Sequence, residues 1–267
     1  THYNQLGYDD NIISGTTIAA KTPGSYANGI RVSIIDSKAD QTLTVAGVST
    51  VGLGVTQSVA GRVVAGAAGT SVLDGYLKGI VTGVPETGKA EVKVLQHVSV
   101  AGTVTNVDYQ QSGTYCFKAN EMISVEAQST NIGVGGTTNI TTATDWFSQQ
   151  EVVLTTKDGN GNPIKLEWDQ LADAPGTSSY ASARGGRFDE LHIVVIDDKG
   201  EITGNAGTVL EKHLSLSKAT DAEYSVGSTA YWRKFLASNS KYIYGGSAPS
   251  GISTTGFVDG SSTAIGT

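Results

Sequence analysis

The clearest pattern in the chain is an apolar run at residues 190–196, which reads Glu-Leu-His-Ile-Val-Val-Ile. A run this rich in β-branched residues predicts a central strand that is covered on both faces. A tight turn signal, Asp-Lys-Gly, follows at 198–200, and residues 209–217 then alternate between apolar and polar side chains. We therefore expect the two segments to pair as an antiparallel hairpin.

Several shorter patterns predict further strands and helices around this hairpin. Residues 30–36 alternate like a half-buried strand and follow the turn signals Pro23-Gly24 and Asn28-Gly29. Residues 231–236 give the clearest helix, residues 241–244 a short closing strand, and residues 166–171 one helical turn. Other strands are expected over 75–84, 90–100, 101–109, 117–125 and 145–156, with a turn at 157–163.

A nearly uncharged stretch punctuated by glycine begins at residue 41 and gives way to strand patterns that continue to residue 127. It predicts a small antiparallel β-barrel or β-sandwich. Residues 128–144 are polar and uncharged, which predicts a mobile loop. The expected fold class is α+β, predominantly antiparallel β with few helices. Its domains are a discontinuous one over 1–40 and 145–250, an inserted β-rich one over 41–144, and a flexible tail over 251–267.

Composition supports a chain rich in strands and turns. Glycine supplies 34 of 267 residues, about twice the usual ~7%, whereas proline supplies 5. Only 16% of residues are charged, fewer than the faces of a long-helix bundle need. The net charge of −7, with 18 basic residues, disfavours nucleic acid as a partner. Residues 41–61 carry no charge but are rich in Gly, Ser, Thr and Gln, so no membrane span is expected.

Two short motifs resemble binding loops. Residues 83–90 nearly spell a phosphate-binding loop, but Ala90 stands where a Ser or Thr should follow the lysine, and a strand pattern follows; a hairpin turn is expected. Asp158, Asn160 and Asn162 match the first, third and fifth positions of a calcium loop, and Asp169 stands at the twelfth, where a bidentate glutamate is expected. Pro163 replaces the glycine of the sixth position, so a β-turn is favoured over a weak calcium site.

No other pattern points to a catalytic or metal centre. The four histidines (His2, His97, His192 and His213) lack the spacing of a metal site, and His192 is expected to be a hydrogen-bonded structural residue. The single cysteine, Cys116, is expected to be a small buried hydrophobe beside Phe117. The acidic pairs 9–10, 189–190 and 197–198 flank turns or strand ends, where solvated carboxylates are usual. We expect no enzyme activity and no cofactor.

Two parts of the chain, residues 21–37 and 175–246, resemble a known family. The first contains Pro-Gly-Ser-Tyr-Ala-Asn-Gly-Ile-Arg-Val at 23–32. The second contains the motifs at 175–186, 189–198, 207–212, 216–219, 231–233 and 240–243. In their order and joint presence they resemble the tail sheath proteins of contractile-tailed bacteriophages, the T-even-like group that includes many cyanophages.

The resemblance implies a structural virion protein, located in the tail and assembled in the cytoplasm of the host bacterium. It implies rings of subunits that slide and rotate as nearly rigid bodies, so that contraction drives the tail tube into the host and the viral genome can be ejected. The partners would be other sheath subunits. The matching segments correspond to the middle, outer portion of a sheath protein, so this chain is expected to be a fragment that is monomeric alone.

Two other functions are compatible with the sequence. The 41–144 region could be an exposed module that binds glycans or a host surface, although aromatic residues for sugar stacking are few there (Tyr76, Tyr109, Tyr115 and Phe117). A carbohydrate-active β-sandwich enzyme would need two carboxylates about 5–9.5 Å apart across a groove. The sequence does not place such a pair.

Overall fold

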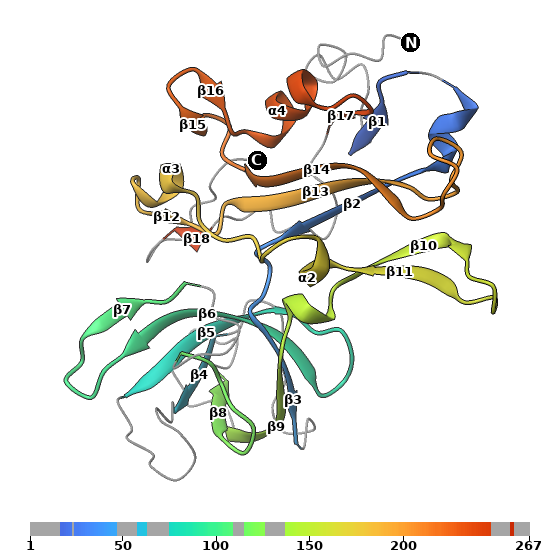
Figure 1. The fold of residues 1–267 in the computed structure, drawn as a ribbon. Coiled ribbons are helices and arrows are strands. Elements are labelled where there is room, and N and C mark those ends of the chain that lie inside the picture. Colours follow the sequence, from blue (N-terminus) through green and yellow to red (C-terminus); the bar gives the residue numbers. More distant parts are fainter. Residues whose placement is uncertain are drawn as a thin grey trace. The chain divides into compact units, whose positions relative to one another are not determined.

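The chain folds into two compact units in a computed structural model (Figure 1). The structure describes residues 17–22, 24–46, 58–62, 75–108, 115–125, 137–246 and 257–258. Unit 1 comprises Thr1–Ser37 and Glu151–Thr267, and unit 2 comprises Lys38–Gln150. Residues 38–40 and 145–150, which the sequence placed in the discontinuous domain, therefore belong to unit 2. The expected tail at 251–267 lies outside the described residues, except for residues 257–258.

Unit 1 is organised around a three-stranded antiparallel sheet in the order β14 (Thr208–Ser217), β13 (Glu190–Asp197), β2 (Ile30–Asp36). Strand β13 is central, and every residue from Leu191 to Asp197 is buried. The register pairs Glu190 with Ser217 on one side and Leu191 with Asp36 on the other. The predicted central strand and its hairpin partner are confirmed. An apolar run of this kind is stable only where both faces of the strand are buried away from water.

Helix α4 (Trp232–Asn239) and a second pair of strands complete the core of unit 1. Strand β17 (Ile243–Gly245) pairs with β1 (Ile18–Ala20), although β1 is the first described strand along the chain and β17 the last but one. Figure 1 shows α4 and β17 following β14 in the chain, on the same side of the sheet. Buried side chains of β13, β14, α4 and β17 pack together in one cluster, which contains Leu191, Ile193, Val195, Leu216, Tyr231, Trp232, Leu236 and Ile243. The predicted helix and closing strand are confirmed.

Short elements fill the rest of unit 1. The hairpin β10 (Glu151–Lys157) and β11 (Pro163–Glu167) leads into α2 (Trp168–Leu171), the expected helical turn. The strand expected over 145–156 starts only at Glu151, because residues 147–149 form the short 3-10 helix η2 (Phe147–Gln149). The remaining elements are η1 (Ser25–Gly29), α3 (Ser179–Ser182), β12 (Gly186–Arg187), β15 (Glu223–Ser225), β16 (Ser228–Thr229) and β18 (Phe257–Val258).

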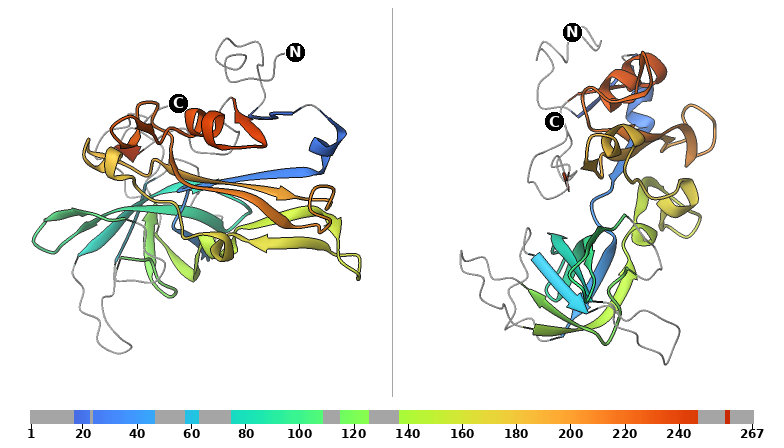
Figure 2. Two further views of the ribbon diagram at one scale, coloured as in Figure 1. Left: turned by 45° about the horizontal axis from the view of Figure 1, so that its top comes forward. Right: turned by 90° about the vertical axis from the view of Figure 1, so that its left-hand side faces the viewer.

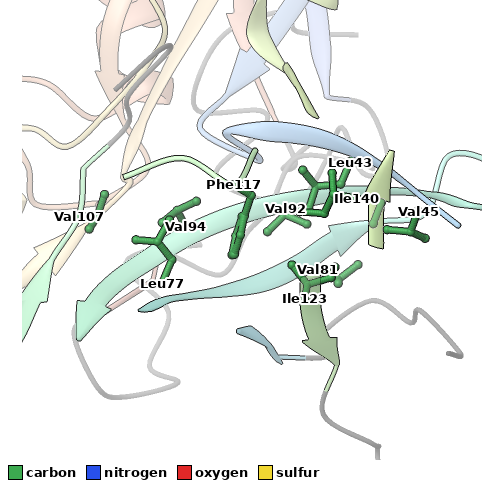
Figure 3. Packing of buried hydrophobic residues seen from close by; sticks show 11 residues of the cluster. Leu43, Val45, Leu77, Val81, Val92, Val94, Val107, Phe117, Ile123 and Ile140 are labelled. Carbon is green, nitrogen blue, oxygen red and sulfur yellow. The ribbon is translucent and has the colours of Figure 1, made fainter. Parts of the chain in front are cut away.

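Unit 2 is a seven-stranded antiparallel sheet in the order β3-β9-β8-β4-β5-β6-β7. Its strands are β3 (Gln41–Val45), β4 (Ser58–Arg62), β5 (Tyr76–Gly83), β6 (Lys89–Val98), β7 (Val104–Asn106), β8 (Met122–Val125) and β9 (Thr137–Asp145). Strand β3 also pairs with β6, through Gln41 opposite Val92 and Thr44 opposite Lys89. Figure 3 shows the side chains inside this sheet, among them Leu43, Leu77, Val92, Phe117 and Ile123.

The prediction of a loop over 128–144 is wrong for its second half. Residues 137–145 form strand β9, which pairs with β3 and β8, whereas residues 128–136 lie outside the described residues. The segment carries one large apolar residue, Ile140, so its pattern lacks the usual alternation of a half-buried strand. Ile140 is 1% exposed inside the core, and the hydroxyls of Thr138, Thr141 and Thr144 donate to β3 or its flanking carbonyls. Neighbouring strands, rather than local hydrophobicity, stabilise β9.

Both units are therefore predominantly antiparallel β, with a few short helices. Figure 2 shows the strands and helices from two further directions. Cys116 is buried beside Phe117, as expected.

Candidate functional site

The calcium-like loop is a tight turn between β10 and β11. Asp158 Oδ1 accepts hydrogen bonds from the backbone N–H groups of Asn160 and Asn162, each at 2.9 Å. The Gly161 N–H donates to the Asp158 carbonyl at 3.0 Å, and Gly161 has a φ of 83°. Asp169 lies beyond β11, in the first turn of α2. The favoured β-turn is thus confirmed, and one oxygen of the Asp158 carboxylate is engaged by the turn itself.

The segment that resembles a phosphate loop is the hairpin turn between β5 and β6, as predicted. The Lys89 N–H donates to the Glu86 carbonyl at 3.0 Å, and Lys89 Nζ lies 2.5 Å from Glu86 Oε1. Lys89 begins strand β6 rather than a helix. A helix N-terminus that would face a phosphate is therefore missing at this turn.

His192 is a structural residue, as predicted. Its Nδ1 accepts the Ser215 N–H at 2.9 Å, and its Nε2 lies 2.9 Å from the Asp173 carbonyl. Both ring nitrogens are thus engaged, Nδ1 as an acceptor and Nε2 facing a carbonyl. Ser215 has a φ of 52°, and the β13–β14 register shifts between Leu191 and Ile193. The histidine thus holds a bulge in β14 in place.

The other described histidines also have close neighbours. The ring of His97 lies 5.0 Å from that of Tyr115. His2 lies outside the described residues. Among the residues that the structure describes, no group of three or more His, Cys, Asp and Glu side chains is placed to hold a metal ion.

Serine, histidine and glutamate side chains meet where β14 faces the end of α4. Ser240 Oγ donates to Glu211 Oε2 at 2.6 Å, and His213 Nε2 lies 3.0 Å from the same oxygen. A nucleophilic triad needs the serine on the histidine, with the acid behind it. In this cluster Ser240 and His213 both contact Glu211 instead. Ser240 Oγ also accepts the N–H groups of Tyr242 and Ile243, so it has no free position from which to attack.

The Glu211 cluster joins β14 to the segment after α4. Glu211 Oε1 accepts the Lys241 N–H at 2.7 Å, in addition to the two contacts of Oε2. Burial raises the pKa of Glu211, but the hydrogen bonds from Ser240, the Lys241 amide and His213 outweigh this and hold it below its ordinary value. No spacing of residues in the sequence indicates this cluster, although Glu211 and Ser240 both lie in motifs of the family-like segments.

Lys21 closes the C-terminal end of α4. Its Nζ donates to the carbonyls of Leu236, Ala237 and Ser240 at 3.0, 2.8 and 2.5 Å. The Leu236 carbonyl also accepts the Ser240 N–H at 3.1 Å, and a cation at this end of the helix complements the helix dipole. Burial lowers the pKa of Lys21, and the negative charge of Glu211 partly opposes this change. The ammonium group lies 4.7 Å from the ring centre of Tyr244.

The acidic pairs at the ends of β13 are partly buried, which corrects the expectation of solvated carboxylates. Asp189 and Asp197 are both 0% exposed, and Asp198 is 5% exposed. Asp189 accepts hydrogen bonds from the N–H and hydroxyl of Ser178 and from the hydroxyl of Ser217. Each acid therefore holds a loop against a strand end. The pair at 9–10 lies outside the described residues.

At the other end of β13, Asp197 holds the following loop and Asp198 holds strand β10. Asp197 Oδ2 accepts from the N–H groups of Ile202 and Thr203 and from the Thr203 hydroxyl. Asp198 accepts from the N–H and hydroxyl of Thr155 on β10. Burial raises the pKa of each carboxyl, but these hydrogen bonds together lower it below 3.8.

In unit 2 the most deeply buried charges are Lys93 and Asp40. Lys93 Nζ lies 2.7 Å from Asp40 Oδ1, and the Val94 N–H donates to the other oxygen at 2.8 Å. The side chains of Lys93 and Asp40 are 0% and 3% exposed. Glu91 joins the two ends of the unit, because it contacts Lys38 Nζ at 2.6 Å and accepts from Trp146 Nε1 at 3.1 Å. The Trp146 N–H also donates to the Asp40 carbonyl.

Two of the aromatic residues considered for sugar stacking lie in or against the core. Phe117 is 1% exposed, and Tyr115 packs against the same cluster. Tyr76 is 39% exposed, and Tyr109 lies outside the described residues. Among the three that the structure describes, Tyr76 is therefore the one exposed side chain, and Tyr115 is half-buried.

Comparison with known proteins gives no match: no family model, curated protein or solved structure is similar to this chain. Within the described ranges, none of the helices is both long and apolar enough to cross a membrane.

Proposed function

We propose that the chain is a structural part of the sheath of a contractile bacteriophage tail, with no enzymatic role. The observation that carries this proposal is that the two family-like segments fold together. Residues 21–37 and 175–246 are far apart in sequence, yet β2 pairs with β13 along seven residues, from Leu191 opposite Asp36 to Asp197 opposite Ile30. Lys21 of the first segment caps α4 of the second. Their order in the sequence is thus matched by a shared core.

The polar clusters of unit 1 support a mechanical role. Asp189 and Glu211 each join separate chain segments through several hydrogen bonds, and Asp197 holds the loop after β13 through its Oδ2. Such fixed cores suit a subunit that moves as a rigid body while its contacts with neighbours change. The partners would be other sheath subunits, and the protein would be located in the virion tail.

Within this proposal, unit 2 is an insertion in the sheath-type unit. We favour a small barrel over a two-sheet sandwich for its finer description. All seven of its described strands belong to one sheet, and β3 pairs with β9 on one side and with β6 on the other. The β3–β6 pairing links the first strand of the sheet to its sixth, which supports the barrel.

The coding sequence that flanks this chain in its source genome tests the proposal. A sheath gene should continue into a C-terminal α/β domain and stand beside genes for other tail parts. Antibodies raised against the chain should also decorate contractile tails along their length in electron micrographs of the phage. A reading frame embedded among metabolic genes, or label confined to fibres or heads, would contradict the proposal.

The expected state of the isolated chain offers a second measurement. Light scattering should give the mass of one chain, since the assembly contacts are expected to come from other parts of the protein. Discrete rings or tubes formed by this chain alone would show that the fragment itself contains the assembly contacts.

A further inference from the structure

We propose that Asn160, at the tip of the β10–β11 hairpin, is a site of spontaneous deamidation, and that the fold protects Asn28 from the same reaction. The chain has two Asn-Gly pairs, Asn28-Gly29 and Asn160-Gly161. This inference is independent of the proposed function, because it rests on the exposure and packing of these two pairs.

The reaction needs only the polypeptide and water. The backbone nitrogen of the following residue attacks Cγ of the asparagine and forms a new C–N bond. The original bond between Cγ and the amide nitrogen Nδ2 breaks, and ammonia leaves with the proton of the attacking amide. Water then opens the resulting succinimide at either carbonyl, which gives aspartate or isoaspartate. Glycine as the following residue favours the attack because it has no Cβ to obstruct it and the widest backbone freedom.

The geometry around Asn160 leaves room for this attack. Residues 157–162 are all exposed. A Cβ placed on Gly159 or on Gly161 would meet no atom within 4 Å, so the space around the tip is open. The Gly161 N–H is held by one hydrogen bond, to the Asp158 carbonyl at 3.0 Å. Opening this solvent-exposed turn disturbs no buried side chain, so it costs little free energy.

Asn28 has an exposed side chain but a fixed backbone. It belongs to η1, and Gly29 behind it is buried. The Gly29 carbonyl accepts the N–H groups of Asp198 and Lys199 at 2.8 and 3.4 Å. A Cβ on Gly29 would lie 3.1 Å from Glu201 Oε2. Rotation of the Asn28–Gly29 peptide toward the Asn28 side chain therefore requires the β13–β14 loop to move away.

The product would change the charge of the tip. Aspartate at position 160 adds a negative charge two residues from Asp158, and isoaspartate adds a backbone atom to a turn whose hydrogen bonds depend on its length. A third asparagine, Asn162, precedes Pro163. Proline has no backbone N–H to lose, so Asn162 serves as an internal control that should not react by this route.

The test is incubation of the whole protein at mildly alkaline pH, followed by protease digestion and mass spectrometry of the peptides that contain each asparagine. We expect Asn160 to convert at least roughly tenfold faster than Asn28 in the folded protein, and the two rates to converge in denaturant. Asn160→Gln should abolish the conversion at that position and leave the Asn28 rate unchanged. Equal native rates at the two pairs, or no conversion at Asn160, would overturn the proposal.

Discussion

Buried carboxylates find partners in two ways in this chain, from neutral donors at the ends of β13 and from a lysine beside Asp40; unit 1 also holds one buried charge pair, with Lys218 Nζ 3.5 Å from Asp36 Oδ2. In unit 1, the carboxylates at the two ends of β13 accept hydrogen bonds from backbone N–H groups and hydroxyls, and each one fastens a loop to a strand end. In unit 2, Asp40 faces a buried lysine, Lys93, as well as a backbone N–H. A carboxylate bound by neutral donors tolerates the loss of one donor better than a charge pair tolerates the loss of its partner.

The largest expected effect is that of Lys93→Met, which leaves the Asp40 carboxylate buried beside an apolar side chain. We expect a loss of about 3–5 kcal/mol in the free energy of unfolding of unit 2. Denaturant unfolding followed by hydrogen exchange should place the loss at the amides of β3 and β6. The control is Lys165→Met, which breaks an exposed pair with Glu151 at 2.7 Å and should cost about 0–1 kcal/mol.

Adding Asp40→Asn to the Lys93 variant sharpens the test, because it removes the carboxylate charge that has lost its lysine partner. The double variant should be more stable than Lys93→Met alone. If the single variant costs no more than the control, the Lys93–Asp40 pair contributes no more to stability than an exposed pair does.

A smaller effect is expected for Asp189→Asn in unit 1. The amide presents an N–H₂ group where the carboxylate accepted from Ser178 or Ser217, so one donor loses its partner. The expected loss is about 2 kcal/mol, measured by the unfolding midpoint of unit 1. Asp169→Asn, at an exposed position of the same unit, is the matched control and should change stability by no more than about 0.5 kcal/mol.

Lys21→Met tests the cap on α4. The three carbonyls that Lys21 contacts would lose a charged donor, and we expect a loss of about 1 kcal/mol. Hydrogen exchange should rise at the end of α4 and in β17 while β13 stays protected. Lys234→Met, at an exposed position on the same helix, should leave these rates unchanged; equal effects of the two variants would show that the cap contributes nothing.

The smallest effect concerns pH. The folded pKa values of Asp197, Asp198 and Glu211 lie below their ordinary values of 3.8, 3.8 and 4.5. Their contribution to stability is therefore complete above those values and is lost as the pH falls through the folded pKa values. Between about pH 5 and about pH 3, Glu211→Gln should lose less stability than the parent protein. Glu223→Gln, on exposed β15, should follow the parent, and a parallel loss in both variants would contradict the role of Glu211.

Much of unit 1 could be predicted from the sequence because its strongest signals are local. The run from Leu191 to Ile196 is apolar enough to require burial on both faces, and the turn after it fixes its hairpin partner. Strand β9 in unit 2 could not be predicted, since its threonines carry little hydrophobic pattern and its pairing depends on β3, more than ninety residues away at Thr44 opposite Thr142.

The buried polar clusters of unit 1 could not be predicted from the sequence either. Asp189 and Asp197 look like surface acids in the sequence because they flank strand ends, but their loops fold back over them. Glu211, Ser240 and Lys21 come from three separate segments, and no local spacing joins them.

The sequence by itself determined the antiparallel β character, the central strand with its hairpin, and the helix and closing strand that follow, because periodicity and turn chemistry act over a few residues. Only the tertiary structure decided that β2 lies on the other edge of β13, that β1 pairs with β17, and that the acids at the ends of β13 are buried and accept hydrogen bonds from neighbouring loops. Those pairings depend on which distant segments can bury their apolar side chains together while their polar groups form hydrogen bonds. The order of residues along the chain does not contain that information.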